Sequence, residues 1–265
     1  MIDAIHQLAK LTGHPSIELT SRGNTAIFFA LYLAKKAGKT KVFIPDQGGW
    51  FTFKTYPKIL GMDMNVIKTD DGIIDDIPIA DNAVLLYVQP AGYFAAQNMK
   101  ALYEKCNGKT MVIADVSGGI GSDMCSGEYA DILVGSFSEW KPINIGYGGF
   151  LSIKEKIIWE RGKDILSLNK VNSLLEKELT KKIESLPKRY AFFSHHVKKI
   201  KRDLQKYGII HPEKKGIVVV VGYSGEKEKE EVIAYCKKNN YPFTLCPRYI
   251  RVMKPAISIE VKRLV

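Results

Sequence analysis

Short apolar runs alternate with helix-like segments through the first 150 residues of this chain. The apolar runs are continuous, as expected of strands buried on both faces of a sheet. They lie at Lys41–Pro45, Val66–Lys68, Ala83–Gln89, Lys109–Asp115 and Ile132–Val134. The helix-like segments lie at Asp3–Leu11, Gly23–Gly38 and Asn98–Cys106. Strand and helix in alternation predict an α/β domain with a mostly parallel sheet between two helical layers.

The pattern changes after Ile153. Two amphipathic helices are expected first, then a mixture of strands with one charged helix. The helices are expected at Val171–Leu186, Lys188–Tyr207 and Glu226–Asn239, and the strands at Gly216–Gly222, Pro242–Leu245 and Ala256–Val261. We therefore predict a large domain over residues 1–170 and a small C-terminal α+β domain over residues 171–265.

The net charge of the 265-residue chain is +11, and it is unevenly distributed. Through residue 153 there are 13 Lys/Arg against 15 Asp/Glu, a charge of −2; from Lys154 onward there are 26 against 13, a charge of +13. Such a basic region could attract nucleic acid, an anionic membrane surface or a phosphorylated substrate. A lysine-rich, solvated helix surface is the simpler interpretation, so binding to tRNA is an alternative that we do not favour.

Several other classes of protein are disfavoured. No apolar stretch approaches the length of a membrane span, and Met1–Pro15 lacks the pattern of a signal peptide. The four cysteines are widely separated, which argues against a zinc site or a disulfide framework. His195 and His196 are adjacent and point in different directions on a helix, so we expect no metal there. These features favour a cytoplasmic protein.

Candidate chemistry gathers where predicted strands end. Lys141 follows the run Ile132–Val134 and precedes a glycine-rich turn, and Asp115 ends another strand. Ligands of parallel sheets collect at the carboxyl ends of strands. A desolvated lysine has a lowered pKa and supplies a neutral amine that attacks carbonyl groups. Taken alone, such a lysine is more often an ordinary surface residue.

The segments around these residues resemble the cofactor-binding motifs of a known enzyme family. S-F-S-E-W-K is similar to that family's S-F-H-x-x-K, which aligns Lys141 with the cofactor lysine and Ser136 with a serine that contacts the cofactor phosphate. I-A-D-V is similar to its I-E-D-A, which aligns Asp115 with the aspartate that pairs with the pyridine nitrogen.

Two further motifs agree. Trp50 lies eleven residues before Gly61, the spacing of the family's ring-stacking aromatic residue. R-G-N-T-A-I is similar to the phosphate-binding S-G-T-A-A-L turn, and it supplies Gly23, Asn24 and Thr25 at a predicted helix start. Together these motifs resemble the fold-type I pyridoxal-phosphate enzymes, most closely the DegT/DnrJ/EryC1/StrS aminotransferases, over roughly residues 19–152.

The resemblance implies a fold and a chemistry. The fold is a three-layer αβα large domain, as in aspartate aminotransferase, with a small C-terminal domain, and the cofactor is pyridoxal 5′-phosphate held as a Schiff base on Lys141. The partners are an amino donor and a keto or aldehyde acceptor, such as a sugar or amino-acid derivative, and a second subunit in a homodimer. Arg248 or Arg251 would bind a substrate carboxylate.

The chain departs from the family at four positions, listed here: Gly118, Ser138, Pro142 and Tyr147. Reaction type within this fold depends on substrate-facing residues, so these departures leave alternatives open. One alternative keeps the cofactor for a lyase, a desulfurase or a tRNA-dependent aminoacyl-modifying enzyme. Another is a scaffold or regulatory protein that has lost catalysis, although a chain without activity has no need to keep both Lys141 and Asp115.

Overall fold

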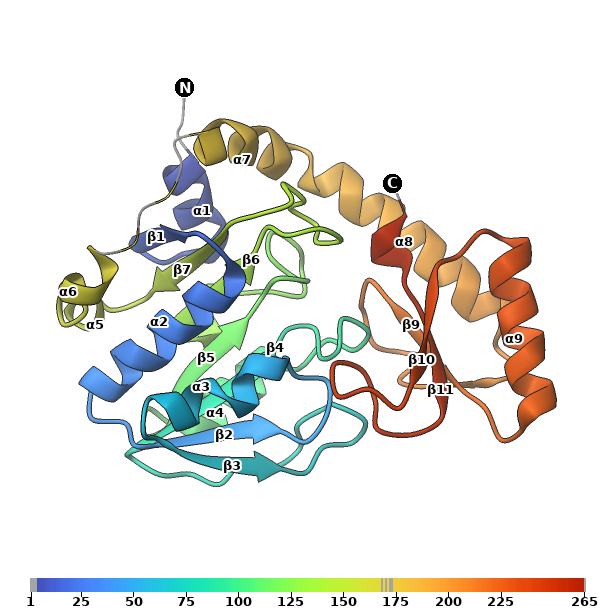
Figure 1. Cartoon of the computed structure of the whole chain (residues 1–265), viewed down its shortest axis with the longest axis horizontal. Helices are drawn as coiled ribbons and strands as arrows, with labels where there is room; N and C mark the ends of the chain where they lie inside the picture. Colours follow the sequence, from blue (N-terminus) through green and yellow to red (C-terminus); the bar gives the residue numbers. More distant parts are fainter. Residues whose placement is uncertain (1–3, 168, 170, 172–173, 265) are drawn as a thin grey trace.

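The computed structural model describes residues 4–167, 169, 171 and 174–264, and these residues build two sheets (Figure 1). The larger sheet has seven strands within the described residues, in the order β1-β7-β6-β5-β4-β2-β3. Their bounds are β1 Ser16–Thr20, β2 Lys41–Pro45, β3 Asp63–Ile67, β4 Ala83–Val88, β5 Met111–Asp115, β6 Ile132–Ser136 and β7 Gly149–Ile153. The five strands from β6 to β3 run parallel, and β7 and β1 complete the sheet in antiparallel pairings.

Helices cover both faces of this sheet, which makes the large domain a three-layer structure (Figure 1). Side chains of α1, α4 and α7 join the core on one face, and those of α2, α5 and α6 join the core on the other. Their bounds are α1 Ala4–Thr12, α2 Gly23–Lys36, α3 Tyr56–Ile59, α4 Met99–Cys106, α5 Lys156–Glu160, α6 Lys163–Leu166 and α7 Leu174–Glu184. β4, β5 and β7 are fully buried, since helices lie on both sides of them.

The small domain is a four-stranded antiparallel sheet with two helices (Figure 1). The strand order is β10-β11-β9-β8. The bounds are α8 Leu186–Asp203, β8 Gly208–Ile209, β9 Val219–Gly222, α9 Glu226–Lys238, β10 Phe243–Cys246 and β11 Ala256–Ile259. The buried face of α8 carries Phe193, Val197 and Ile200, which pack on the valine-rich β9.

The predicted fold class is confirmed: the large sheet is mostly parallel and a small α+β domain follows it. β1 was not predicted, because S-I-E-L-T is short and half polar. The helix predicted at Asp3–Leu11 is α1, although position 3 lies outside the described residues, as do positions 172 and 173 at the start of the helix predicted at 171–186. That second helix is α7.

The two domains meet along the N-terminal half of α8. Leu186 belongs to the large-domain core, and Phe193, two turns further on, belongs to the core of the small domain. The helix α7, before it, packs against α1 and contributes Leu175 and Leu179 to the large-domain core. The predicted boundary at residue 170, a position that is itself not described, therefore precedes a helix that packs with the large domain.

In the described part of the chain, none of the helices combines the length and apolar character needed to cross a bilayer.

Candidate functional site

Lys141 lies in the loop between β6 and β7, beside the carboxyl edge of the sheet. Its side chain is buried, and its Nζ donates a hydrogen bond of 2.6 Å to the hydroxyl of Tyr93. The same Nζ lies 5.4 Å from the ring centroid of Trp50 and 4.5 Å from that of Tyr93. Aromatic faces attract a cation at these distances, so the two rings hold the amine in place.

Asp115 ends β5, the central strand of the sheet, and its side chain is 5% exposed. Ser117 donates to its Oδ1 through both the hydroxyl (2.5 Å) and the backbone N–H (3.0 Å). Burial raises the pKa of Asp115, while the bonds from Ser117 and the nearby charge of Lys141 lower it in part. A buried carboxylate of this kind favours a cationic or proton-donating partner.

The start of α2 lies against the end of β6. A Cβ built on Gly23 would come within 2.5 Å of Ser136 Cβ, so only glycine allows this approach. The amides of a helix's first turn have no partner within the helix, and with the helix dipole they favour an anion. Ser136 Oγ donates to Ser138 Oγ at 2.9 Å, which places two hydroxyl groups beside these amides.

One cavity collects most of the residues that the sequence singled out. A space of about 40 Å³ touches Gly23, Asn24, Trp50, Asp115, Ser136 and Lys141. An adjoining space of about 280 Å³ also touches Gly23, Asn24 and Trp50. It extends to Arg22 and Gly148. Thr25 lies outside both linings, and its hydroxyl is 3.2 Å from that of Ser21.

A hydrogen bond orients the indole ring of Trp50: its Nε1 donates to Asn24 Oδ1 at 2.8 Å. This bond joins the loop after β2 to the first turn of α2. The indole therefore presents one orientation to the cavity.

The two arginines proposed for substrate binding do not join this cavity. Arg251 is buried and its guanidinium bonds to Glu260, with Nη2 2.7 Å from Oε2, and to Ser258 Oγ at 3.0 Å. Arg248 is exposed. A substrate carboxylate would have to compete with Glu260 for the guanidinium of Arg251.

Three polar residues of the cavity were not assigned a role from the sequence: Tyr93, Ser117 and Ser138. The sequence could have predicted the two serines, since each lies two positions after a predicted site residue at the end of a strand, where ligand-binding residues cluster. Ser117 also accepts a 2.9 Å hydrogen bond from the N–H of Ser136, which links β5 to β6. The sequence did not indicate Tyr93 as a site residue, because it lies in a loop far from Lys141 along the chain.

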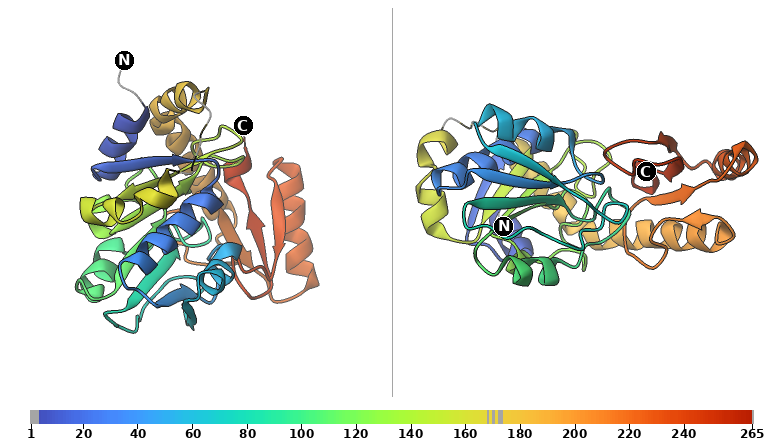
Figure 2. Two further views of the ribbon diagram at one scale, coloured as in Figure 1. Left: turned by 60° about the vertical axis from the view of Figure 1, so that its left-hand side comes forward. Right: turned by 90° about the horizontal axis from the view of Figure 1, so that it is seen from below.

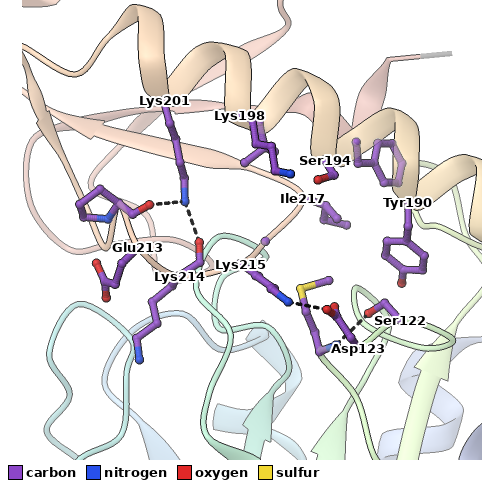
Figure 3. Close-up of a pocket in the computed structure, with 15 residues that line it drawn as sticks. Ser122, Asp123, Tyr190, Ser194, Lys198, Lys201, Glu213, Lys214, Lys215 and Ile217 are labelled. Atoms are coloured by element: carbon purple, nitrogen blue, oxygen red, sulfur yellow. Dashed lines mark hydrogen bonds and ion pairs between the residues drawn. The ribbon is translucent and has the colours of Figure 1, made fainter.

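A separate cavity of about 500 Å³ lies where α8 faces loops of both domains (Figure 3). Lys215 pairs there with Asp123, and Lys201 Nζ donates to the carbonyl oxygens of Pro212 and Lys214 at 2.9 and 2.6 Å. The pair between Lys215 and Asp123 links the two domains across this cavity.

A candidate cation site lies elsewhere, at Asp70, Asp71 and His211. Their ligating atoms all lie within 4.8 Å of one another. His211 Nε2 is 2.8 Å from the carbonyl oxygen of Asp70, and Lys254 pairs with Asp71. A metal ion would therefore have to displace Lys254.

Comparison with solved structures defines the class of fold. The chain is similar to PseC of Helicobacter pylori, an aminotransferase involved in the biosynthesis of pseudoaminic acid, with a TM-score of 0.74 and 13% identity over 97% of this chain and 84% of that one. It is also similar to 3-amino-5-hydroxybenzoic acid synthase (TM-score 0.72, 13% identity, 99% and 85% covered). A third is a putative sugar aminotransferase from Streptococcus pneumoniae in its PLP form (0.67, 14%, 97% and 85%). The chain therefore has the fold of these proteins.

Comparison of sequences adds one finding. Residues 187–265, which include most of α8 and the rest of the small domain, match the family described as MJ1341 family C-terminal domain. No curated protein matches the chain.

Proposed function

We propose that this protein is a pyridoxal-phosphate-dependent aminotransferase that acts on a keto or aldehyde acceptor, with Lys141 as the lysine that holds the cofactor. The observation that carries the proposal is the meeting of Lys141, Asp115, Trp50 and the start of α2 around one cavity. An amine, a buried carboxylate, an aromatic face and an anion-binding helix start are the four groups that this cofactor requires.

The residues fit the cofactor. The two adjoining spaces together reach the lower end of the range of small-molecule sites, about 300–1,000 Å³. The close approach of Gly23 to Ser136 leaves backbone amides and two serine hydroxyl groups for a phosphate. Asp115 needs a partner that favours its charged form, and a protonated ring nitrogen supplies one. Lys141 would have to release the Tyr93 hydroxyl as it engages the cofactor.

Each residue then has a defined role. When bound, the cofactor supplies an electron sink for charge that develops on the carbon bearing the amino group. Gly23, Asn24 and Ser136 would bind its phosphate, and Trp50 would fix the plane of its ring. Asp115 would keep a proton on the ring nitrogen. Lys141 Nζ would attach the cofactor and, once free, move the substrate proton.

Tyr93 has a further role in this arrangement. Its hydroxyl accepts the hydrogen bond from Lys141 Nζ, and Tyr93 lines the same cavity. A hydroxyl in this place can orient the amine and receive a hydrogen bond from it while a proton is moved.

The experiment that tests the proposal is a spectrophotometric titration of the purified chain with pyridoxal phosphate. Wild type should give a visible absorption band that borohydride reduces, with the label retained on the peptide that contains Lys141. Lys141→Ala should lose the band. Lys109→Ala, which changes an exposed lysine, is the matched control and should keep it.

A wild-type chain with no band, or with a label on a different lysine, would overturn the proposal. A reduced label on Lys141 would support it without any assay of activity.

The acceptor belongs to the same proposal. The similar structures include proteins described as sugar aminotransferases and a serine palmitoyltransferase, so the fold by itself allows more than one reaction. Amino acids that discharge the absorption band, followed by keto or aldehyde compounds that restore it, would support transamination. Release of a fragment without restoration would support a lyase. The homodimer and the cytoplasmic location stay predictions, which sedimentation and cell fractionation would test.

A further inference from the structure

A third cavity, of about 600 Å³, borders the loop that carries Lys141. Three separate segments line it: this loop, the region around the α7–α8 junction, and the 3₁₀ helix η3 (Val261–Arg263) near the C-terminus. The side chains that matter for its chemistry are Trp140, Lys182, Arg189, Lys262 and Arg263. Neither the motifs nor the proposed cofactor roles account for it.

The lining is strongly basic. Among the described residues it has four cationic side chains and a single carboxylate, that of Glu139. Both guanidinium groups, those of Arg189 and Arg263, have a buried Nε with no hydrogen-bond acceptor among the described residues, although Arg263 Nε lies 3.7 Å from Glu260 Oε2 in an ion pair. A buried donor without an acceptor costs free energy. The four cationic side chains around this cavity, two of them with an incompletely bonded guanidinium, favour an anion there.

Lys262 adds a buried positive charge. Its Nζ lies 3.4 Å from Glu260 Oε2, 5.3 Å from the ring centroid of Tyr93 and 5.7 Å from that of Trp140. The pKa of Lys262 is lowered to about 7, mainly by burial; the charge of Glu260 opposes this shift, and the charges of Arg251, Lys141 and Arg263 add to it. Glu260 is already bonded to Arg251, so the positive charges exceed the negative ones here.

We propose that this cavity binds a phosphate monoester through Arg189, Arg263, Lys182 and Lys262. A phosphate monoester carries close to two negative charges and three acceptor oxygens, so it can satisfy several cationic donors at once. A carboxylate offers one charge and two oxygens, which leaves more of these donors unpaired. The cavity's volume exceeds that of a phosphate group, so the organic part of the ester also fits.

Tyr93 lies between this cavity and the proposed active site, and Gly146 lines both this cavity and the space of about 280 Å³. The ring of Tyr93 faces Lys262 on one side, and its hydroxyl accepts the hydrogen bond of Lys141. An anion beside Lys262 would therefore change the electrostatic field at Lys141. This site does not depend on the proposed cofactor, since its residues and its test are different.

Isothermal titration calorimetry with inorganic phosphate, at fixed ionic strength, tests the proposal. The chain is measured alone and after saturation with pyridoxal phosphate, so that a cofactor phosphate site is filled in the second series. Binding should saturate below about 10 mM phosphate in both series. Arg263→Gln, Arg189→Gln and Lys182→Gln should each weaken it, the arginine changes by about tenfold or more.

Lys188→Gln is the matched control, because Lys188 is exposed, adjoins Arg189 on α8 and lies outside the lining. Lys182 is also exposed, so its variant should fold normally. Equal losses in Lys188→Gln and Lys182→Gln, or no saturable binding in wild type, would overturn the proposal. Succinate at the same concentrations should bind at least about tenfold more weakly than phosphate; equal binding would contradict the phosphate assignment.

Proton uptake gives an independent measurement. A bound anion raises the pKa of Lys262 from about 7, so binding near pH 8 should take up a fraction of a proton, visible as a buffer-dependent heat. Lys262→Met should remove this uptake. Uptake unchanged in Lys262→Met would contradict the role of Lys262.

Two sources of the phosphate give different results. If it belongs to the substrate, phosphoethanolamine should perturb the absorption of the cofactor-loaded chain more strongly than ethanolamine, and Arg263→Gln should abolish the difference. If it belongs to an effector, inorganic phosphate should still bind, and phosphoethanolamine and ethanolamine should change the absorption of the cofactor-loaded chain equally. Loss of the cofactor band with phosphate binding intact would overturn the proposed function alone.

Discussion

Several cationic side chains lie around one buried carboxylate, that of Glu260. Glu260 is fully buried and lies within 4 Å of Arg251, Lys262 and Arg263. Burial alone would raise its pKa, but Arg251 and Lys262 hold the pKa at about 2. The group therefore stays ionised at neutral pH, and its bond to Arg251 occupies the guanidinium that the sequence proposed for a substrate carboxylate.

The pH dependence of stability should reveal Lys262. Its pKa is about 7 in the folded chain against 10.5 for the free side chain, so between these values the unfolded chain binds more protons. The free energy of unfolding should therefore rise with pH from about 7 toward 10, by up to roughly 1 kcal/mol per pH unit from this group. Urea denaturation at a series of pH values measures the slope.

In that experiment Lys262→Met should flatten the slope, and the exposed-residue variant Lys109→Met should leave it unchanged. The same slope in all three proteins would show that Lys262 titrates normally.

At the scale of elements, the proposed site depends on how α2 begins. Arg22 precedes the helix in an extended conformation and makes no side-chain cap, so the first-turn amides are left to other acceptors. The end of β6 lies against this turn at Gly23. The sheet and the helix start therefore form the anion-binding part of the site together.

Gly23→Ala should push the start of α2 away from the end of β6. The new Cβ would lie 2.5 Å from Ser136 Cβ and 3.1 Å from its Cα, so the strand end must shift. We expect a loss of about 1–3 kcal/mol in stability and weaker binding of pyridoxal phosphate. Gly225→Ala is the control, since nothing lies within 4 Å of its added Cβ. Unchanged stability and cofactor affinity in Gly23→Ala would contradict the close approach.

The whole molecule has buried cores on both faces of the large sheet and a further one in the small domain, and α8 runs from the first of these into the last (Figure 2). Tyr190 on this helix donates to the carbonyl oxygens of Gly118 and Ile120, which lie in the segment after Asp115. The N–H of Gly48 also donates to the carbonyl oxygen of Tyr249 at 2.8 Å. These contacts couple the small domain to two loops of the proposed site.

Tyr190→Phe should weaken that coupling. Removing the hydroxyl leaves two carbonyl groups without this donor, which should cost about 1–3 kcal/mol. Lys215→Gln breaks the exposed pair with Asp123 and should cost less than about 1 kcal/mol. Chemical denaturation followed by fluorescence measures both. A larger loss in Lys215→Gln than in Tyr190→Phe would contradict this account of the junction.

Much of the fold follows from the sequence because buried parallel strands require continuous apolar runs. The segments at residues 41–45, 83–89 and 109–115 became β2, β4 and β5 with boundaries within two residues. The sequence did not predict that β7 runs antiparallel to β6 or that β1 joins the sheet, because strand direction depends on the path of the connecting chain. The sequence F-T-F-K-T-Y-P-K-I-L-G after Trp50 also suggests one continuous helix, whereas the structure has the separate short helices η1 (Phe51–Lys54) and α3.

The sequence alone determined most of the elements, the mostly parallel sheet and the residues at strand and helix ends, because periodicity and end position are local properties. Lys141 and Asp115 were found in this way, Trp50 and Gly23 were found through the resemblance to a known family, and the structure brings all four to one cavity. Only the tertiary structure decided which distant groups meet them. Tyr93 reaches Lys141 from 48 positions away, and Arg251 is paired with Glu260. Such pairings depend on packing between elements, which no local pattern records.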